Sequence, residues 1–185
     1  ELSGSLENLM EFQDEIHKAK EFNGEKVVEN IKDGLELKDV GLNYDTVPVL
    51  EKINLGISKN ESIAFVGESG SGKTTLVNIL AGLLPPDEGT LIINGIDRKE
   101  IDITTYQSKI GYITQDPVIF TDTLFNNVTL WASQTEANLN RFHMVMQKAA
   151  LTNFIASQPE GANTVLGNDG VNLSGGQKQR ISIAR

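Results

Sequence analysis

The segment Gly67–Thr74 matches the pattern G-x-x-x-x-G-K-[ST] in full. In this pattern, small residues let successive backbone N–H groups turn inward and hold phosphate oxygens. A helix that starts near Lys73 directs its N-terminal dipole at the same anion. Lys73 is then expected to reach the β and γ phosphates and the Thr74 hydroxyl to bind Mg²⁺. The spacing therefore predicts a nucleoside-triphosphate site made by Gly67, Glu68, Ser69, Gly70, Ser71, Gly72, Lys73, Thr74 and Thr75.

A second glycine-rich stretch, Leu173-Ser-Gly-Gly-Gln177, lies later in the chain and precedes an apolar segment typical of a helix. A hydroxyl group and small residues at a helix N-terminus form another anion site, because the backbone can approach the anion closely. The chain therefore holds a second predicted phosphate-type site, formed by Ser174, Gly175, Gly176 and Gln177.

With these two sites in this order, residues 35–185 resemble the nucleotide-binding domain of the ATP-binding-cassette family, whose signature is the pentapeptide Leu173–Gln177. The resemblance implies that two such domains, identical or paralogous, enclose two ATP molecules head to tail. Each signature then contacts the ATP of the opposite subunit. It also implies that Tyr44 stacks on adenine, and that Gln115 contacts Mg²⁺ and the attacking water and senses a transmembrane partner.

Two further segments, Phe120–Val128 and residues 161–170, resemble those that exporters of this family place against their transmembrane domains. Asn168 departs from the usual Glu, and Ala162 from the usual aromatic residue. The resemblance implies an ATPase on the cytoplasmic face of the cell membrane, where ATP hydrolysis drives export through the transmembrane domain of the same transporter.

Hydrophobic patterns predict the elements that hold these residues. Alternation over 35–44, with a slip near Asp39, and over 53–57 predicts an antiparallel pair of strands. The apolar run Ser62–Val66 predicts a strand buried on both faces of a parallel sheet. The other predicted elements are a helix over 73–83, strands over 90–94 and 110–114, and helices over 135–150 and 152–157.

These elements predict an α/β fold. It consists of a P-loop NTPase core, with a mixed or parallel sheet and an antiparallel β edge subdomain, plus an α-helical signature subdomain that is incomplete at the C-terminus. We expect residues 31–185 to form the nucleotide-binding domain, with 116–180 as its helical subdomain. Residues 1–30, with an amphipathic helix over 5–22, are expected to be a connector that continues a transmembrane helix.

Composition narrows the possible functions. The chain has 185 residues, no Cys and a formal net charge of -9. The absence of Cys excludes thiol catalysis and thiolate metal sites. The acidic balance disfavours a general affinity for nucleic acid, which usually requires a basic face.

The resemblance also implies residues that this sequence does not hold after its signature, namely an Asp–Glu pair that supports Mg²⁺ and the attacking water, and a switch histidine. His17 and His143 are interpreted as surface residues, and Trp131, Met144 and Met146 as core or interface residues. We therefore expect the 185 residues to be a fragment of a longer chain that binds ATP without turning it over.

Two alternatives remain open. One is a soluble ATPase that carries the signature and acts on nucleic acid or ribosomes. The other is a non-catalytic module that holds ATP structurally.

Overall fold

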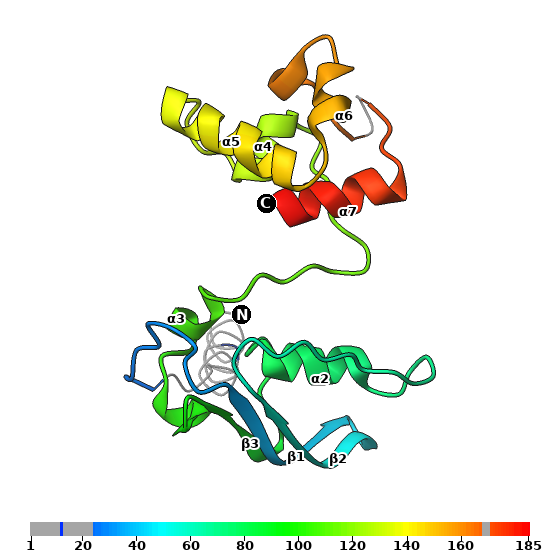
Figure 1. Ribbon diagram of the computed structural model, residues 1–185. Coiled ribbons are helices and arrows are strands. Elements are labelled where there is room, and N and C mark those ends of the chain that lie inside the picture. Colours follow the sequence, from blue (N-terminus) through cyan, green and yellow to red (C-terminus); the bar gives the residue numbers. More distant parts are fainter. Residues whose placement is uncertain (1–11, 13–23, 168–170) are drawn as a thin grey trace, which may run out of the picture. The chain divides into compact units, whose positions relative to one another are not determined.

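The computed structural model describes residues 12, 24–167 and 171–185 (Figure 1). These residues form two compact units, and the division follows Gly111. Except for Phe12, the predicted helix over 5–22 lies outside the described residues, as does Asn168. No helix in the described part of the chain is long and apolar enough to cross a bilayer.

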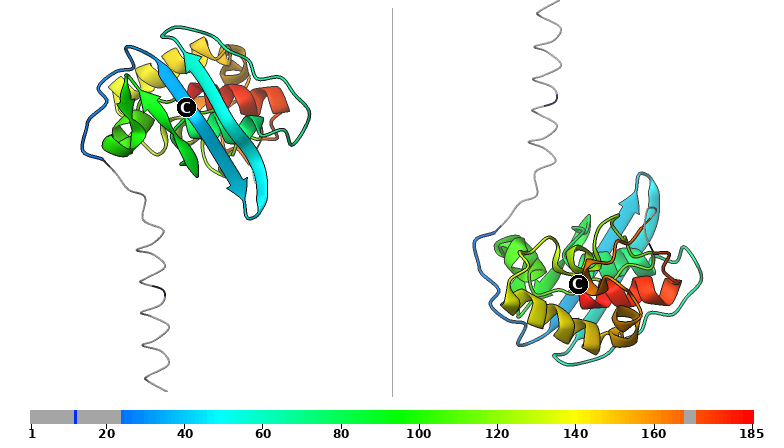
Figure 2. Two further views of the ribbon diagram at one scale, coloured as in Figure 1. Left: turned by 90° about the horizontal axis from the view of Figure 1, so that it is seen from below. Right: turned by 90° about the horizontal axis from the view of Figure 1, so that it is seen from above.

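Within the described residues, the first unit is built on a four-stranded antiparallel sheet in the order β2-β1-β3-β4. β1 (Leu35–Tyr44) and β2 (Val47–Ile57) lie side by side and form the predicted hairpin (Figure 2). β3 (Glu88–Ile93) corresponds to the predicted strand over 90–94 and pairs with the other edge of β1, and β4 (Ile96–Asp97) pairs with β3.

A β-bulge interrupts β1 at the predicted slip. The register shifts between Leu37 and Val40, and Asp39 has a φ of 47°. Its backbone N–H donates to Asn54 Oδ1 at 3.0 Å, and its carboxylate accepts a hydrogen bond from Asn54 Nδ2 at 2.9 Å. In a regular strand, residues three apart face opposite sides. The bulge allows Leu37 and Val40 both to be buried in the core.

The core of the first unit lies between the sheet and two helices, α2 (Lys73–Leu80) and α3 (Ile103–Gln107). A 3-10 turn, η1 (Arg98–Glu100), precedes α3. The Tyr106 hydroxyl is buried and donates to the Leu80 carbonyl oxygen at 2.6 Å. α2 ends at Leu80 rather than at the predicted residue 83, because Gly82 turns the chain with a φ of 72°.

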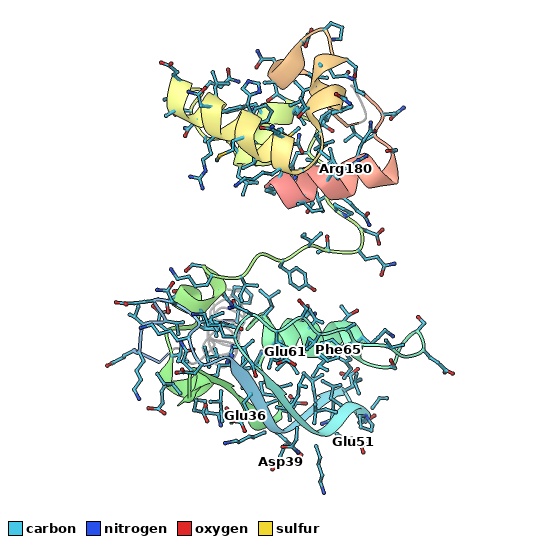
Figure 3. All side chains as sticks on the ribbon, in the orientation of Figure 1. Glu36, Asp39, Glu51, Glu61, Phe65 and Arg180 are labelled. Atoms are coloured by element: carbon cyan, nitrogen blue, oxygen red, sulfur yellow. The ribbon has the colours of Figure 1, made fainter. Side chains whose placement is uncertain are left out.

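Two of the predicted strands are wrong. Ser62–Val66 and Ile110–Thr114 are not strands, and most of their residues are exposed; Val66 is 95% exposed. Phe65, labelled in Figure 3, is the residue of the first segment that is partly buried and packs against the core. The physical reason is that a strand exists only where a neighbouring strand completes its hydrogen bonds. Within the described residues, no strand pairs with either segment.

The second unit is helical. Its elements are α4 (Leu124–Thr129), α5 (Glu136–Lys148), α6 (Thr152–Ala156), η2 (Gly161–Asn163) and α7 (Gly175–Ala184). α5 and α6 confirm the helices predicted over 135–150 and 152–157. They pack with α4 and α7 around a core that includes Phe125, Phe142 and Met146.

The remaining interpretations of single side chains hold in part. His143 is exposed, as expected for a surface residue. Met146 is buried in the core, whereas Met144 is 47% exposed and Trp131 is 53% exposed.

Candidate functional site

The glycine-rich loop that leads into α2 contains two glycines with left-handed backbone. Gly70 has a φ of 82° and Gly72 a φ of 81°, a region that other residues adopt at a cost. A Cβ on Gly70 would meet nothing within 4 Å, whereas a Cβ on Gly72 would lie 2.9 Å from Leu50 Cδ2 and 3.0 Å from the Val49 carbonyl oxygen. The loop therefore packs against β2 at Gly72 and is open at Gly70.

The Lys73 side chain folds back over this loop. Its Nζ donates to the Gly67 carbonyl oxygen at 2.9 Å, to Ser71 Oγ at 3.2 Å and to the Glu68 carbonyl oxygen. An ammonium group has three donors, and each contact uses one of them. The positive charge is therefore held against the backbone of the glycine-rich loop.

The N-terminus of α2 has the features of an anion site. Its N-cap is Gly72, so no side chain caps the first N–H groups, and the first turn contains no acidic residue. Those N–H groups have no acceptor within the helix, and the helix dipole adds partial positive charge to that of Lys73. Thr74 is exposed in the same turn, and Thr75 is buried. The residues present fit a phosphate group.

Tyr44 lies at the end of β1 and pairs with Val47 on β2. Both side chains are more than half exposed. Val47 is two residues from Val49, which contacts Gly72, and this spacing corresponds to about 7 Å along a strand. The structure therefore brings Tyr44 to the end of the hairpin that abuts the phosphate loop.

The second predicted phosphate site lies at the start of α7. Ser174 is the N-cap, and its hydroxyl accepts a hydrogen bond from the Gln177 N–H at 3.2 Å. In return, the Gln177 side chain accepts from the Ser174 N–H at 2.8 Å, which completes a capping box. Gly175 and Gly176 are exposed, and the first turn contains no acidic residue. α7 therefore begins with an open, well-capped N-terminus.

Gln115 lies in an exposed bend, in which the Thr114 hydroxyl donates to the Asp116 carbonyl oxygen at 3.1 Å. It belongs to the second unit together with α7, whereas Tyr44 and the phosphate loop belong to the first. The predicted site residues thus fall into two groups, one in each unit. Among the described residues, no cluster of three His, Asp or Glu side chains could hold a metal ion.

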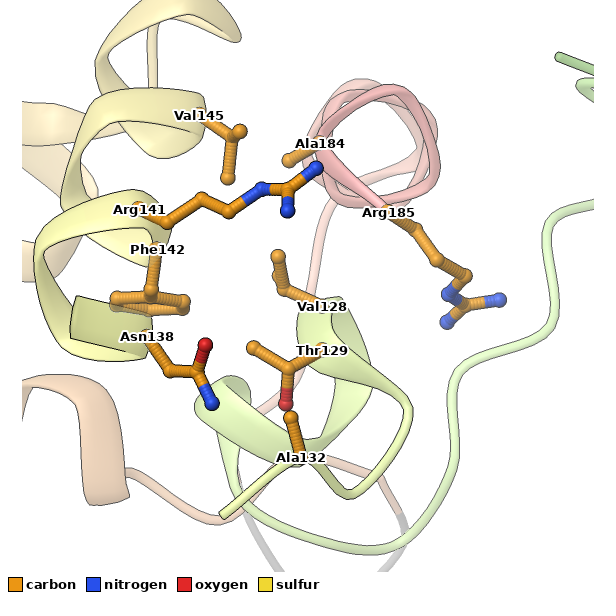
Figure 4. A pocket seen from close by; sticks show the side chains of 9 residues that line it. All are labelled: Val128, Thr129, Ala132, Asn138, Arg141, Phe142, Val145, Ala184 and Arg185. Atoms are coloured by element: carbon orange, nitrogen blue, oxygen red, sulfur yellow. The ribbon is translucent and has the colours of Figure 1, made fainter. Parts of the chain in front are cut away.

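A cavity of about 250 Å³ lies between α4, α5 and α7 (Figure 4). None of the predicted site residues lines it. It is therefore a separate feature from the two groups of predicted site residues.

Comparison with known protein families identifies the chain. Residues 50–185, which include the phosphate loop, Gln115 and the signature, match the family model described as ABC transporter. The chain belongs to the ABC transporter family. Membership confirms the resemblance predicted from the sequence and implies that the chain binds ATP.

The relatives are ABC exporters. The chain is 37% identical over 185 residues to ABC transporter B family member 1 of Dictyostelium discoideum. This match covers 98% of the chain and 20% of the Dictyostelium protein. It is 39% identical over 158 residues to the ATP-dependent lipid A-core flippase of Thiobacillus denitrificans. This match covers 84% of the chain and 27% of the flippase. The chain therefore spans between a fifth and a third of the length of these curated relatives.

A solved structure confirms the predicted fold class. The structure of a bacterial Atm1-family ABC exporter with ATP bound matches 86% of this chain and 29% of its own chain, with 30% identity and a TM-score of 0.73. The chain therefore has the P-loop NTPase fold of an ABC exporter nucleotide-binding domain.

Sequence reasoning missed a polar network in the helical unit of this ABC domain. The Asp122 carboxylate accepts hydrogen bonds from Asn126 Nδ2 at 2.9 Å, from the Thr123 N–H at 2.6 Å and from Trp131 Nε1 at 2.7 Å. These donors, of which the Asn126 amide is the strongest, hold the pKa of Asp122 below its usual value. The indole ring of Trp131 is therefore fixed by a carboxylate although it is exposed.

A second missed contact joins the end of α7 to α4 and to the segment that precedes α4. Arg185 donates to the carbonyl oxygens of Asn127 and Val118, which lie 58 and 67 positions away in the sequence. No local pattern signals such a contact, because its partners become neighbours only when the helices pack.

Proposed function

We propose that this chain is the ATP-binding domain of an ABC exporter and couples ATP binding and hydrolysis to transmembrane export. The observation that carries this proposal is the presence of two built anion sites on one chain. One is the loop at α2 with its Lys73 ammonium, and the other is the capped N-terminus of α7.

In the first group, we assign ATP to the loop and to the residues around it. Tyr44 stacks on adenine, the loop and the N-terminus of α2 bind the phosphates, and Lys73 exchanges its contacts with the loop for phosphate oxygens. Thr74 from α2 is assigned to Mg²⁺, and the family resemblance supports the same assignment for Gln115 of the other unit. When bound, Mg²⁺ neutralises charge that develops on the transferred phosphoryl group.

In the second group, we assign Ser174, Gly175, Gly176 and Gln177 to the ATP held by a second nucleotide-binding domain, identical or paralogous. An anion at this N-terminus is favoured by the exposed backbone of the first turn and by the helix dipole. Two domains then close head to tail on two ATP molecules. Gln115 is assigned to the attacking water and to the signal between ATP and the transmembrane domain.

The names of the relatives support a proposal for where the chain acts. Because they are exporters, we propose that the chain acts at the cytoplasmic face of the cell membrane beside the transmembrane domain of the same transporter. The net charge of -9 supports a role that does not involve nucleic acid.

The first test measures binding of a fluorescent ATP analogue to the purified chain. Lys73→Met removes the ammonium group from the loop and is expected to weaken binding at least about tenfold, since it removes charge-assisted contacts to phosphate. Lys59→Met, in an exposed turn of the same unit, is the matched control and should leave the affinity unchanged. Equal affinities for the wild type and Lys73→Met would contradict the assignment of the phosphate loop.

The second test addresses the signature with two variants that both keep a good N-cap. Ser174→Asn and Ser174→Asp each provide an oxygen that can cap α7, but only the Asp adds a negative charge beside the proposed phosphate. We expect ATP-dependent dimers, measured by light scattering, to form with Ser174→Asn and to be lost with Ser174→Asp. If both variants dimerise equally, the signature does not bind phosphate as proposed.

A further inference from the structure

Arg185, directly after α7, makes three contacts with the segment that follows Gln115. Its Nε donates to the Asn127 carbonyl oxygen at 2.8 Å, and its Nη2 donates to the Val118 carbonyl oxygen at 3.0 Å. The guanidinium carbon also lies 5.3 Å from the centre of the Phe120 ring. Figure 4 shows that Arg185 points away from Arg141, the other arginine at the cavity.

The segment that Arg185 contacts is itself hydrogen-bonded to α4. Asn127 is fully buried, and its Nδ2 donates to the carbonyl oxygens of Phe120 at 2.9 Å and Thr123 at 3.0 Å. Its Oδ1 accepts from the Phe120 N–H at 2.8 Å. This side chain therefore ties residues 120–123 to α4, and Arg185 ties the same region to α7.

Arg185 and the signature stand at opposite ends of one helix. α7 is ten residues long, which corresponds to about 15 Å, and its Ile181 and Ala184 are buried in the core of the unit. At the other end of the contact, Val118 is three positions after Gln115, and residues 110–118 contain neither helix nor strand. Arg185 therefore links the end of α7 to the segment that carries Gln115.

We propose that Arg185 is a positioning residue that sets the location of Gln115 according to the position of the signature helix. This inference rests on the proposed function, since it requires an anion at the N-terminus of α7 and a role for Gln115 in hydrolysis. It adds a physical link between the two, made by one planar guanidinium that reaches two carbonyl oxygens at once.

The test is a double-mutant cycle on ATP hydrolysis by the intact transporter that contains this chain. Arg185→Ala is expected to lower kcat about tenfold, because two charge-assisted hydrogen bonds are lost, and to leave KM for ATP within about twofold. Gln115→Ala lowers kcat more strongly. If Arg185 acts through Gln115, the double variant hydrolyses ATP no more slowly than Gln115→Ala alone.

Two further variants separate positioning from general stability. Arg185→Lys keeps the charge near Phe120 but cannot reach both carbonyl oxygens in one plane, so its kcat should lie between those of the wild type and Arg185→Ala. Arg141→Ala removes an exposed arginine of the same helical unit and should leave kcat unchanged. Trp131, the single Trp of the chain, packs on Phe120 with ring centres 5.0 Å apart, so its emission in the purified chain reports whether each variant keeps this region folded.

The outcomes distinguish this inference from the proposed function. If the wild-type protein fails to bind or hydrolyse ATP, the proposed function is wrong and this inference falls with it. If the wild type hydrolyses ATP and the effects of Arg185→Ala and Gln115→Ala on kcat multiply, Arg185 has a structural role only and the inference alone is overturned. An unchanged kcat in Arg185→Ala with native Trp131 emission overturns it as well.

Discussion

The two left-handed glycines of the phosphate loop provide a sharp test of how the loop is held. Gly70 and Gly72 have the same backbone conformation, with φ of 82° and 81°, but only Gly72 packs closely against β2. Replacing each with Ala therefore imposes the same backbone cost at both positions and a steric cost at one.

The magnitudes follow from these two terms. A non-glycine residue in the left-handed region costs about 1–2 kcal/mol, and this is the whole effect expected for Gly70→Ala. In Gly72→Ala the new Cβ would lie 2.9 Å from Leu50 Cδ2 and 3.0 Å from the Val49 carbonyl oxygen. The Val49 oxygen is backbone and can move only with β2, so the overpacking adds about 1–3 kcal/mol.

The assay is urea unfolding followed by far-UV circular dichroism, with the affinity for a fluorescent ATP analogue measured alongside. Gly72→Ala should lower the free energy of unfolding by more than Gly70→Ala, and it should weaken nucleotide binding as the start of α2 shifts away from β2. Losses of unfolding free energy that agree within about 0.5 kcal/mol, the usual effect of an exposed substitution, would refute the packing argument.

Two further predictions concern pH. Burial raises the pKa of Tyr106 from 10.0 to about 12, so its neutral form contributes stability that is complete below pH 10.0 and is lost as the pH rises towards 12. Tyr106→Phe should lower the free energy of unfolding by about 1 kcal/mol at neutral pH, because the Leu80 carbonyl oxygen loses its donor. Between pH 10.0 and about 12, urea unfolding should show a smaller loss of stability in this variant than in the wild type. For Asp122, whose pKa is lowered, the stabilisation is complete above pH 3.8 and is lost as the pH falls through the lower folded value. Asp122→Asn should remove this acid-induced loss of stability. Trp131 emission, followed during an acid titration of both proteins, measures the difference.

The features that the sequence predicted correctly depend on neighbours along the chain. The helix that begins at Lys73 after the glycine-rich loop and the helix that begins after Ser174 both follow from local spacing. Likewise, the bulge at Asp39 follows from a slip in the alternation of apolar residues within one strand. The predicted domain boundaries and the roles of the site residues stay predictions, since they depend on a bound nucleotide and on partners.

Tertiary structure decided what local patterns could not. The apolar runs Ser62–Val66 and Ile110–Thr114 have strand-like composition, but in the described residues no strand pairs with them, and a strand requires its neighbour's hydrogen bonds. The orientation of the exposed Trp131 ring depends on an acceptor nine positions away, Asp122. The contact of Arg185 with Val118 spans 67 positions and forms only because α4 and α7 pack on one core. Sequence therefore determined most of the elements and the two helices that begin directly after glycine-rich or capping residues. The packing of distant elements determined which segments are paired and which side chains are held together.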